Sequence, residues 1–298
     1  MSTITEHFDV QAYSHIHREG TMRISDKRHL TIGVSLALAL GAAPALSQQA
    51  DKPSFVADGA LSVCVDPTFP PMEFMESVDA KAPVGVDIDM AKALAEVWGV
   101  EARFITMDFN GLLPSLAAAR CDAVISGTLL KEERLKDFDG IAYLNTFSVI
   151  VGKAGSASLS SLDDLAGKSI AVQSGTTYLD LMQKNNEALA AKKLPLANIQ
   201  QYPKQTDAIQ QVLVGRVDGV LSQDTEIAYR EVQNPGQFAV IFTIPPTSFE
   251  PYAAYIRKDE KDKAAFVASV GSLLTSGKLR AIVDEWKLSP QQLDGIGN

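Results

Sequence analysis

The stretch CDAVISGTLLKEER, residues 121–134, indicates how this chain folds because it joins a strand to a basic side chain. Residues 123–127 are mostly apolar, which favours a buried strand, and a short turn leads from them into a charged run that ends at Arg134. The pattern NGLLPSLAAAR before the strand predicts a helix with Asn110 as its N-cap. A helix that leads into a buried strand is typical of βαβ units, whose ligands lie beyond the carboxyl ends of the strands. Arg134 is therefore either a solvated side chain at a helix end or a planar fork that holds a carboxylate.

Strands and helices alternate on both sides of this stretch. Upstream, LSVCV at 61–65 and EARFITM at 101–107 favour strands, and a helix with Asp87 as its N-cap is predicted between them. Downstream, a Gly- and Ser-rich loop at 152–168 precedes a second series of strands and helices, which ends with FAVIFT at 238–243. This order predicts an α/β fold of two lobes.

The second lobe is predicted to be inserted into the first. The segment EPYAAYIRKDE has the pattern of a strand that returns to the first lobe, and two helices follow it. The chain would then cross between the lobes twice, near 144–150 and 243–250, and these two segments would form a hinge. We expect lobe 1 to comprise residues 48–147 and 246–298 and lobe 2 to comprise residues 148–245.

The N-terminal part of the chain has the layout of a secretory signal peptide. Basic side chains precede an apolar run at 31–40, and small residues follow it, as in APA at 43–45. A membrane anchor is the alternative, but the uncharged run ends in small and polar residues, which favours cleavage. We expect residues 1–47 to be a signal peptide with an upstream extension and the mature chain to be periplasmic.

Composition excludes several classes of function for such a mature chain. The 298 residues carry a net charge of −9, which argues against nucleic acid as a partner because phosphate binding needs a basic face. A chain that begins near residue 48 contains no histidine, which excludes a Ser-His-Asp triad, a Cys-His dyad and a His-ligated zinc site. We expect no metal and no cofactor. The four histidines all precede this point, at His7, His15, His17 and His29.

Two cysteines, Cys64 and Cys121, remain in an oxidising compartment, where disulfides form. Cys64 lies in the middle of one predicted strand, whereas Cys121 precedes another. If these strands are neighbours with Asp66 level with Ser126, the cysteines are several residues out of register, and a bridge needs Cα atoms within about 7 Å. We therefore predict two buried free thiols.

Six segments resemble, in order, the segments of one protein family. They are VDPTFPPMEF, GVDIDMAKALAEVWGV, DFNGLLPSLAAARCDAVISGTLLKEER, SLDDLAGKSIAVQSGTT, GRVDGVLSQDT, and EPYAAYIRKDE with SGKLRAIVDEW. Over roughly residues 55–287 the chain resembles the family 3 solute-binding proteins, the periplasmic receptors of ABC importers for polar amino acids. The resemblance implies the two-lobed type II periplasmic binding protein fold, an amino acid-like ligand and permease subunits in the inner membrane as partners. We expect a monomer.

The resemblance also assigns roles to side chains at the predicted strand ends. Arg134 matches the arginine that holds the α-carboxylate of the bound amino acid, and Phe69 matches an aromatic side chain that covers the ligand. Thr177 opens a helix whose first N–H groups favour a carboxylate, and Gln223 or Asp224 would accept from the α-ammonium. Taken singly, Phe69 is also consistent with a place in the core. The predicted ligand site comprises Asp66, Phe69, Ser126, Gly127, Thr128, Arg134, Gln173, Thr176, Thr177, Gln223 and Asp224.

Two positions depart from the family pattern. Two places after Gly127 the family usually has Ser or Thr, whose hydroxyl helps to bind the ligand, but this chain has Leu129. Counting from Gly215, the family's ammonium-binding Asp falls on Gln223, and Asp224 comes one place later. A neutral amide pairs less well with an ammonium, so both departures weaken the implication of an ordinary α-amino acid.

Two other functions are compatible with the same scaffold. Some relatives of this fold are periplasmic dehydratases, such as cyclohexadienyl dehydratase, and this chemistry needs a carboxylic acid with a raised pKa beside the substrate. Asp66, Glu73, Asp108 and Glu132 are available, but none lies in a catalytic motif, and we predict that the chain is not an enzyme. A sensor domain that feeds a membrane kinase is a third reading, and it would require a separate partner chain.

Overall fold

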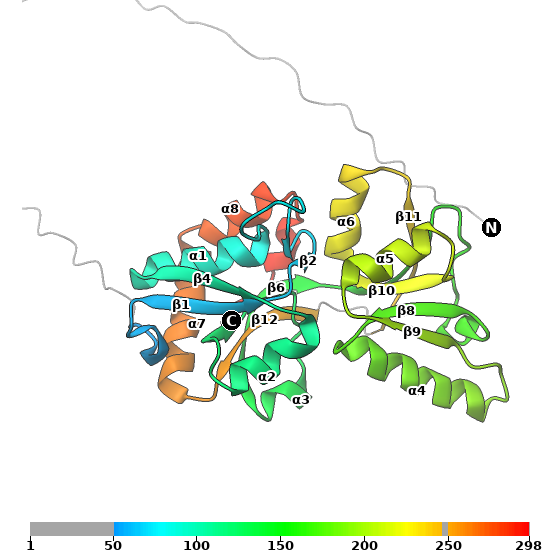
Figure 1. Cartoon of the computed structure of the whole chain (residues 1–298), viewed down its shortest axis with the longest axis horizontal. Helices are drawn as coiled ribbons and strands as arrows, with labels where there is room; N and C mark the ends of the chain where they lie inside the picture. The colour runs from blue at the N-terminus through cyan, green and yellow to red at the C-terminus, as the bar shows by residue number, and fades with distance from the viewer. Residues whose placement is uncertain (1–50, 246–249, 298) are drawn as a thin grey trace, which may run out of the picture. The chain divides into compact units, whose positions relative to one another are not determined.

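The computed structural model describes residues 51–245 and 250–297. The predicted signal peptide and the four histidines lie outside this part of the chain. The described residues form two five-stranded sheets, with helices on both faces of each, and a short two-stranded hairpin (Figure 1). This is the two-lobed α/β fold that the alternation of strands and helices predicts. We call the parts built on the two sheets the first lobe and the second lobe.

The first sheet has the strand order β4-β1-β5-β12-β6. β1 runs parallel to β4 and β5, whereas β12 runs antiparallel to β5 and β6. The strand predicted over 123–127 is shorter than expected, because Gly127 adopts a φ of +53° in the turn that follows it. The five strands are β1 Ala60–Val65, β4 Glu101–Thr106, β5 Ala123–Val124, β6 Phe138–Thr146 and β12 Glu250–Arg257.

Helices cover both faces of this sheet (Figure 1). On one face α1, Val86–Trp98, packs with α7, Glu260–Thr275, and α8, Lys278–Glu285, over apolar side chains such as Val63. On the other face α2, Leu112–Ala117, and α3, Glu132–Leu135, lie over side chains that include Cys64 and Val124. Neighbouring residues of β1 therefore face different helices, as the period of two in a strand requires. The hairpin consists of β2, Thr68–Phe69, and β3, Glu73–Phe74.

Two N-caps differ from the prediction. Asn110 lies inside a 3-10 turn, Phe109–Gly111, and the chain enters α2 at Gly111. Asp87 is the second residue of α1, and its buried carboxylate accepts from the N–H of Gly127 rather than from the helix N-terminus. An acid at the beginning of an amphipathic pattern predicts an N-cap, but here the carboxylate of Asp87 binds a residue that is distant in the sequence instead of the N–H groups of its own helix.

The C-terminal helices fix the beginning of the first lobe. Asp262 of α7 accepts hydrogen bonds from the N–H (2.5 Å) and the hydroxyl (2.8 Å) of Ser54. Trp98 of α1 donates to Ser269 Oγ of α7 at 2.8 Å. Among residues 51–245 and 250–297, no single helix is long and apolar enough to cross a membrane, and only α7 and α8 taken together, with a 68° bend between them, meet these limits.

The second sheet has the strand order β11-β7-β10-β8-β9. β8 runs parallel to β9 and β10, whereas β7 runs antiparallel to β10 and β11. Helix α4, Thr177–Ala191, packs on one face, and α5, Gln205–Leu213, and α6, Asp224–Gln233, pack on the other. The five strands are β7 Ser148–Lys153, β8 Ser169–Gln173, β9 Asn198–Tyr202, β10 Gly219–Gln223 and β11 Phe238–Thr243.

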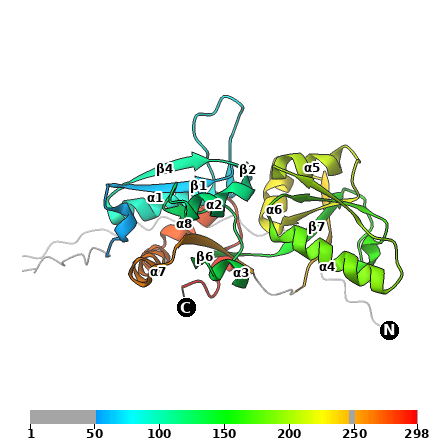
Figure 2. The ribbon, with the colours of Figure 1, turned by 60° about the horizontal axis from the view of Figure 1, so that its bottom comes forward.

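The chain passes between the two sheets twice (Figure 2). β6 of the first sheet ends at Thr146 and β7 of the second begins at Ser148; β11 of the second ends at Thr243 and β12 of the first begins at Glu250. The second lobe is therefore inserted into the first, as the order of elements predicts. The boundaries given above for the two lobes stay a prediction.

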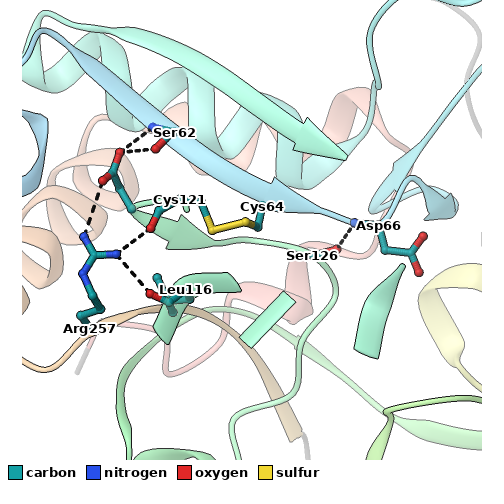
Figure 3. The surroundings of a disulfide bond; sticks show 8 residues. Ser62, Cys64, Asp66, Leu116, Cys121, Ser126 and Arg257 are labelled. Atoms are coloured by element: carbon teal, nitrogen blue, oxygen red, sulfur yellow. Dashed lines mark hydrogen bonds and ion pairs between the residues drawn. A yellow bond between two sulfur atoms is a disulfide. The ribbon is translucent and has the colours of Figure 1, made fainter. Parts of the chain in front are cut away.

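The prediction of two free thiols is wrong, because Cys64 and Cys121 form a disulfide with a Cα–Cα distance of 5.7 Å (Figure 3). The predicted register itself is correct, since Val63 lies opposite Ala123 and Cys64 opposite Val124 in the parallel pair. The two cysteines meet because the chain before Ala123 is bent rather than extended, so sequence separation does not measure distance along the sheet. The bend returns Cys121 to the face of β1 on which Cys64 lies.

Polar contacts hold this bend (Figure 3). Asp122 N donates to Ser62 O (2.8 Å), and Ser62 N donates back to Asp122 Oδ2 (2.9 Å). Arg257 of β12 forms an ion pair with Asp122 (3.6 Å) and donates to Cys121 O (2.6 Å). The disulfide and these contacts fix the entrance of β5, and with it the turn at 126–128, against β1.

Candidate ligand-binding site

A pocket lies beyond the carboxyl ends of parallel strands in both sheets. The structure thus brings together residues that are far apart in the chain but that share a place at strand ends. Seven lining residues are among those predicted: Phe69, Gly127, Arg134, Gln173, Thr176, Thr177 and Gln223. Five further lining residues are outside the predicted set: Glu73, Phe109, Leu129, Tyr178 and Gln205.

Arg134 is half-buried in α3 and belongs to the pocket wall. Its Nη1 donates to Leu129 O at 2.8 Å, and Tyr255 OH donates to the same oxygen at 2.7 Å. A guanidinium has five N–H donors, so this hydrogen bond orients the side chain and leaves donors for a carboxylate. Arg134 forms no ion pair with a neighbouring acid within the described residues, where the arginines in ion pairs are Arg103, Arg230, Arg257 and Arg280.

Asp66, Ser126 and Thr128 lie behind the pocket wall rather than on it. Asp66 N donates to Ser126 Oγ (2.9 Å), which joins the ends of β1 and β5 (Figure 3). Gln173 of the second lobe donates from Nε2 to Asp66 Oδ2 at 2.6 Å. Burial raises the pKa of Asp66 to about 6, and hydrogen bonds from Thr68 and Gln173 oppose part of that rise. Thr128 donates from Oγ1 to Ser126 O (3.0 Å) and lines a neighbouring pocket that also includes Arg134.

Gln223 and Asp224, the two candidates for an ammonium acceptor, are used differently. Gln223 ends β10 and lines the pocket. Asp224 begins α6, and its Oδ1 accepts from Thr146 Oγ1 (2.6 Å) and from Phe147 N (2.9 Å). Asp224 therefore ties the second lobe to the crossing between β6 and β7 and does not line the pocket.

The N-terminus of α4 faces the pocket through Thr176, Thr177 and Tyr178. Thr176 is the N-cap residue, but its hydroxyl donates to Gln173 O (2.7 Å) and does not cap the helix N–H groups. The first N–H groups of this helix of 15 residues lack intrahelical acceptors and carry the positive end of the helix dipole. They are suited to a ligand carboxylate or another acceptor.

Glu73 is the acid that the sequence analysis left out of the site. It lies in β3 and is 1% exposed, and its Oε1 accepts from Ser126 Oγ at 2.9 Å. Asp87 lies behind it, and its two oxygens accept from Gly127 N and Tyr143 OH, both at 2.6 Å. Burial raises the pKa of Glu73 well above its usual range, and the nearby Asp87 raises it further. An acid inside the apolar run PPMEF is the signal in the sequence that could have pointed to this position.

The other unpredicted lining residues follow the same rule of strand ends. Gln205 comes just after β9, and its N–H donates across the lobes to Thr68 Oγ1 (3.3 Å). Its amide Nε2 also donates to the buried Glu226 (2.9 Å), which fixes the amide at the pocket wall. Phe109 lies in the 3-10 turn beyond β4. Applying the rule to every predicted strand would have found both.

The two lobes touch one another around the pocket. Thr225 Oγ1 and Tyr252 OH are 2.8 Å apart, in addition to the bonds from Gln173 to Asp66 and from Gln205 to Thr68. Gly175, with a φ of +81°, packs so closely on Asn110 that a Cβ added to it would lie 2.7 Å from the Asn110 Cα. These contacts exist only while the lobes stay together.

Comparisons with known proteins agree with this geometry. Residues 61–289 match the profile of the bacterial extracellular solute-binding proteins, family 3. The L-arginine-binding protein of Pseudomonas aeruginosa is 26% identical over 243 residues, which cover 78% of this chain and 90% of that protein. A solved ancestral arginine-binding protein bound to arginine is 31% identical, with a TM-score of 0.69, and the match covers 76% of this chain and 98% of that one. A solved ancestral amino acid-binding protein, a precursor of cyclohexadienyl dehydratase, is 27% identical, with a TM-score of 0.64 and coverage of 77% and 96%.

The matches extend over both lobes, because the matched range contains strands of both sheets. They support the two-lobed type II periplasmic binding protein fold and the role of a solute-binding protein. The chain belongs to family 3 of the bacterial extracellular solute-binding proteins.

Proposed function

We propose that this chain binds an amino acid or a related small zwitterion between its two lobes and is the receptor of an ABC importer. The observation that carries this proposal is the pocket wall itself, to which Arg134 of the first lobe and the N-terminus of α4 in the second lobe both contribute. Two groups that favour anions on opposite walls suit one carboxylate that bridges the lobes.

The remaining wall suits the rest of such a ligand. The side-chain carbonyl of Gln223 can accept from an ammonium, while Phe69, Phe109 and Leu129 offer apolar surface. Arginine is the first ligand to test, because relatives of this chain are named for it. Contacts made only when the lobes are together would favour the closed form, and a permease in the inner membrane would recognise that form.

The location and state of the chain are part of the same proposal. Residues 1–47 would direct it to the periplasm as a signal peptide that is then removed, and the mature chain would act as a monomer without a cofactor. The family consists of extracellular proteins, which supports this location.

A dehydratase is the second candidate, and two observations favour it. One solved relative is a precursor of cyclohexadienyl dehydratase, and Glu73 is a pocket-lining acid whose pKa is raised by burial. However, Glu73 Oε1 accepts from Ser126 Oγ, and the buried Asp87 is close enough to raise the pKa of Glu73, so this acid is engaged by groups inside the protein rather than aimed at a substrate. This favours the receptor over the enzyme.

Thermal unfolding of the purified protein against the twenty amino acids and prephenate-like acids tests the proposal. A ligand at 100 times its Kd stabilises the folded state by about 2.7 kcal/mol, which corresponds to a Tm increase of about 5 °C or more. We expect one or a few amino acids to give this shift and to be recovered unchanged. Turnover of a prephenate-like acid would instead establish the dehydratase, and no shift with any amino acid would contradict the proposal.

A further inference from the structure

Two buried carboxyl groups meet behind the Ser126–Gly127 turn. Glu73 of β3 and Asp87 of α1 are 1% and 0% exposed. Each holds one residue of the turn: Ser126 Oγ donates to Glu73 Oε1 (2.9 Å), and Gly127 N donates to Asp87 Oδ2 (2.6 Å). The pair therefore supports the segment that joins β5 to the pocket.

The hydrogen-bond donors around the pair indicate which carboxyl is charged. Asp87 accepts from Gly127 N and from Tyr143 OH, so both of its oxygens have donors, as an anion requires. Glu73 Oε2 has no donor among the described residues. If Glu73 carries a proton on Oε2 and donates it in a hydrogen bond to the Asp87 carboxylate, no buried oxygen of the pair is left without a partner.

The charged groups that act on Glu73 are the carboxylates of Asp87 and Asp66. Asp66, at the end of β1, is the other carboxylate close to Glu73, and Tyr143 of β6 is a neutral phenol. No lysine or arginine within the described residues forms an ion pair with Glu73 or Asp87, although Arg134 lines the same pocket as Glu73. Burial and the negative neighbours raise the pKa of Glu73 well above its usual range.

We infer that Glu73 shares one proton with Asp87 and that this acid–carboxylate pair positions the Ser126–Gly127 turn for ligand binding. Loss of the proton would place two negative charges in contact, which separates the pair and moves the turn. Phe69 would then move as well, because a Cβ on Gly127 would lie 2.7 Å from the Phe69 ring. Glu73 is thus a positioning residue. Its effect on ligand binding rests on the proposed function, whereas the presence of the proton on Glu73 is independent of that function.

Denaturant unfolding between pH 5 and 8 tests the proton. In the unfolded chain Glu73 ionises near pH 4.3, whereas the folded protein keeps the proton, so rising pH favours unfolding of the wild type. Glu73→Gln mimics the protonated acid and removes the contribution of Glu73 to the pH dependence of unfolding. We expect the ratio of the wild-type to the Glu73→Gln unfolding constant to rise by up to tenfold per pH unit. The exposed Glu76→Gln is the matched control and should follow the wild type.

A ratio that stays constant over this range would overturn the inference, since it would mean that Glu73 is already ionised in the folded protein. If Glu73→Gln does not fold, Asp87→Asn replaces it. That change removes the charge beside Glu73, so the pH dependence should again be weaker than in the wild type, and an unchanged dependence would contradict the shared proton.

Arginine binding tests the positioning role. Above the pH at which the unfolding ratio stops rising, we expect the wild-type affinity for arginine to fall at least fivefold more than that of Glu73→Gln, because only the wild type loses the proton there. Titration of arginine itself affects both proteins equally. Parallel losses would overturn the positioning role. If arginine fails to bind the wild type at any pH, the proposed ligand is wrong, while the unfolding experiment still decides the proton.

Discussion

The two walls of the pocket differ in charge and in the way they are held. The first-lobe wall carries Arg134 and Glu73, and a disulfide and buried hydrogen bonds fix the turn beside them. The second-lobe wall consists of amides, hydroxyls and a helix N-terminus, without a charged side chain among its described lining residues. If the proposed function is correct, the first lobe would meet the charge of the ligand with a charged side chain, while the second lobe would add uncharged hydrogen-bonding groups when the lobes come together.

Removing the disulfide should have the largest effect, and it should fall on the first lobe. Cys64 and Cys121 are 57 residues apart. Closing a loop of this size reduces the conformational entropy of the unfolded chain, which raises its free energy by about 4 kcal/mol at 25 °C. We expect the Cys64→Ala, Cys121→Ala variant to lose 2–5 kcal/mol of unfolding free energy, measured in urea with the wild type under oxidising conditions.

The reduced wild type is the control for this variant, because it lacks the bond but keeps both side-chain volumes. In the variant, the rate of hydrogen exchange should increase, relative to the oxidised wild type, more in β1 and β5 than in β8 and β10. Equal acceleration in both sheets would mean that the disulfide does not stiffen one wall in particular.

Arg134→Ala should have the next largest effect. It removes the charged donors from the first-lobe wall, and hydrogen bonds to charged groups contribute about 1.5–3 kcal/mol each. We therefore expect the Kd for arginine, measured by calorimetry, to rise about 100-fold, which is about 2.7 kcal/mol. Thr177→Val on the opposite wall removes one neutral hydroxyl and should cost tenfold at most.

The exposed Arg280→Ala, which breaks a surface ion pair with Asp284, controls for a general loss of positive charge and should leave the Kd unchanged. A larger loss in Thr177→Val than in Arg134→Ala would reverse the comparison between the walls.

How far the sequence predicts these walls depends on the kind of structure involved. Strand-end rules bring Phe69, Arg134, Gln173 and Gln223 to one place, and all four line the pocket, because the geometry of parallel strands is local and regular. The same regularity makes the β1–β5 register predictable. Roles in ligand binding remain predictions for all of these residues.

Irregular backbone and long-range hydrogen bonds are not predictable from the sequence in this way. The bend before β5 brings Cys121 to Cys64, although a count along an extended strand separates them. Asp87 and Asp224 have the pattern of helix beginnings, but each accepts hydrogen bonds from a distant segment. Such partners depend on how the lobes and loops pack, and a single sequence holds no periodic signal for them.

Gly175→Ala should have a smaller effect than Arg134→Ala, and it tests the contact between the walls. The added Cβ would lie 2.7 Å from the Asn110 Cα, so the closed form must shift while the separated lobes need not. A methyl group at a φ of +81° also strains the backbone by about 1–2 kcal/mol in either form. We expect the Kd for arginine, measured by calorimetry, to rise about tenfold, or about 1.4 kcal/mol.

Gly215→Ala separates the two causes, because Gly215 has a φ of +70° and no atom within 4 Å of its added Cβ. This variant should show the same loss of unfolding free energy as Gly175→Ala and an unchanged Kd. If both variants bind arginine equally well, the contact between Gly175 and Asn110 is absent from the bound state, and the second wall meets the ligand without approaching the first as closely as the structure shows.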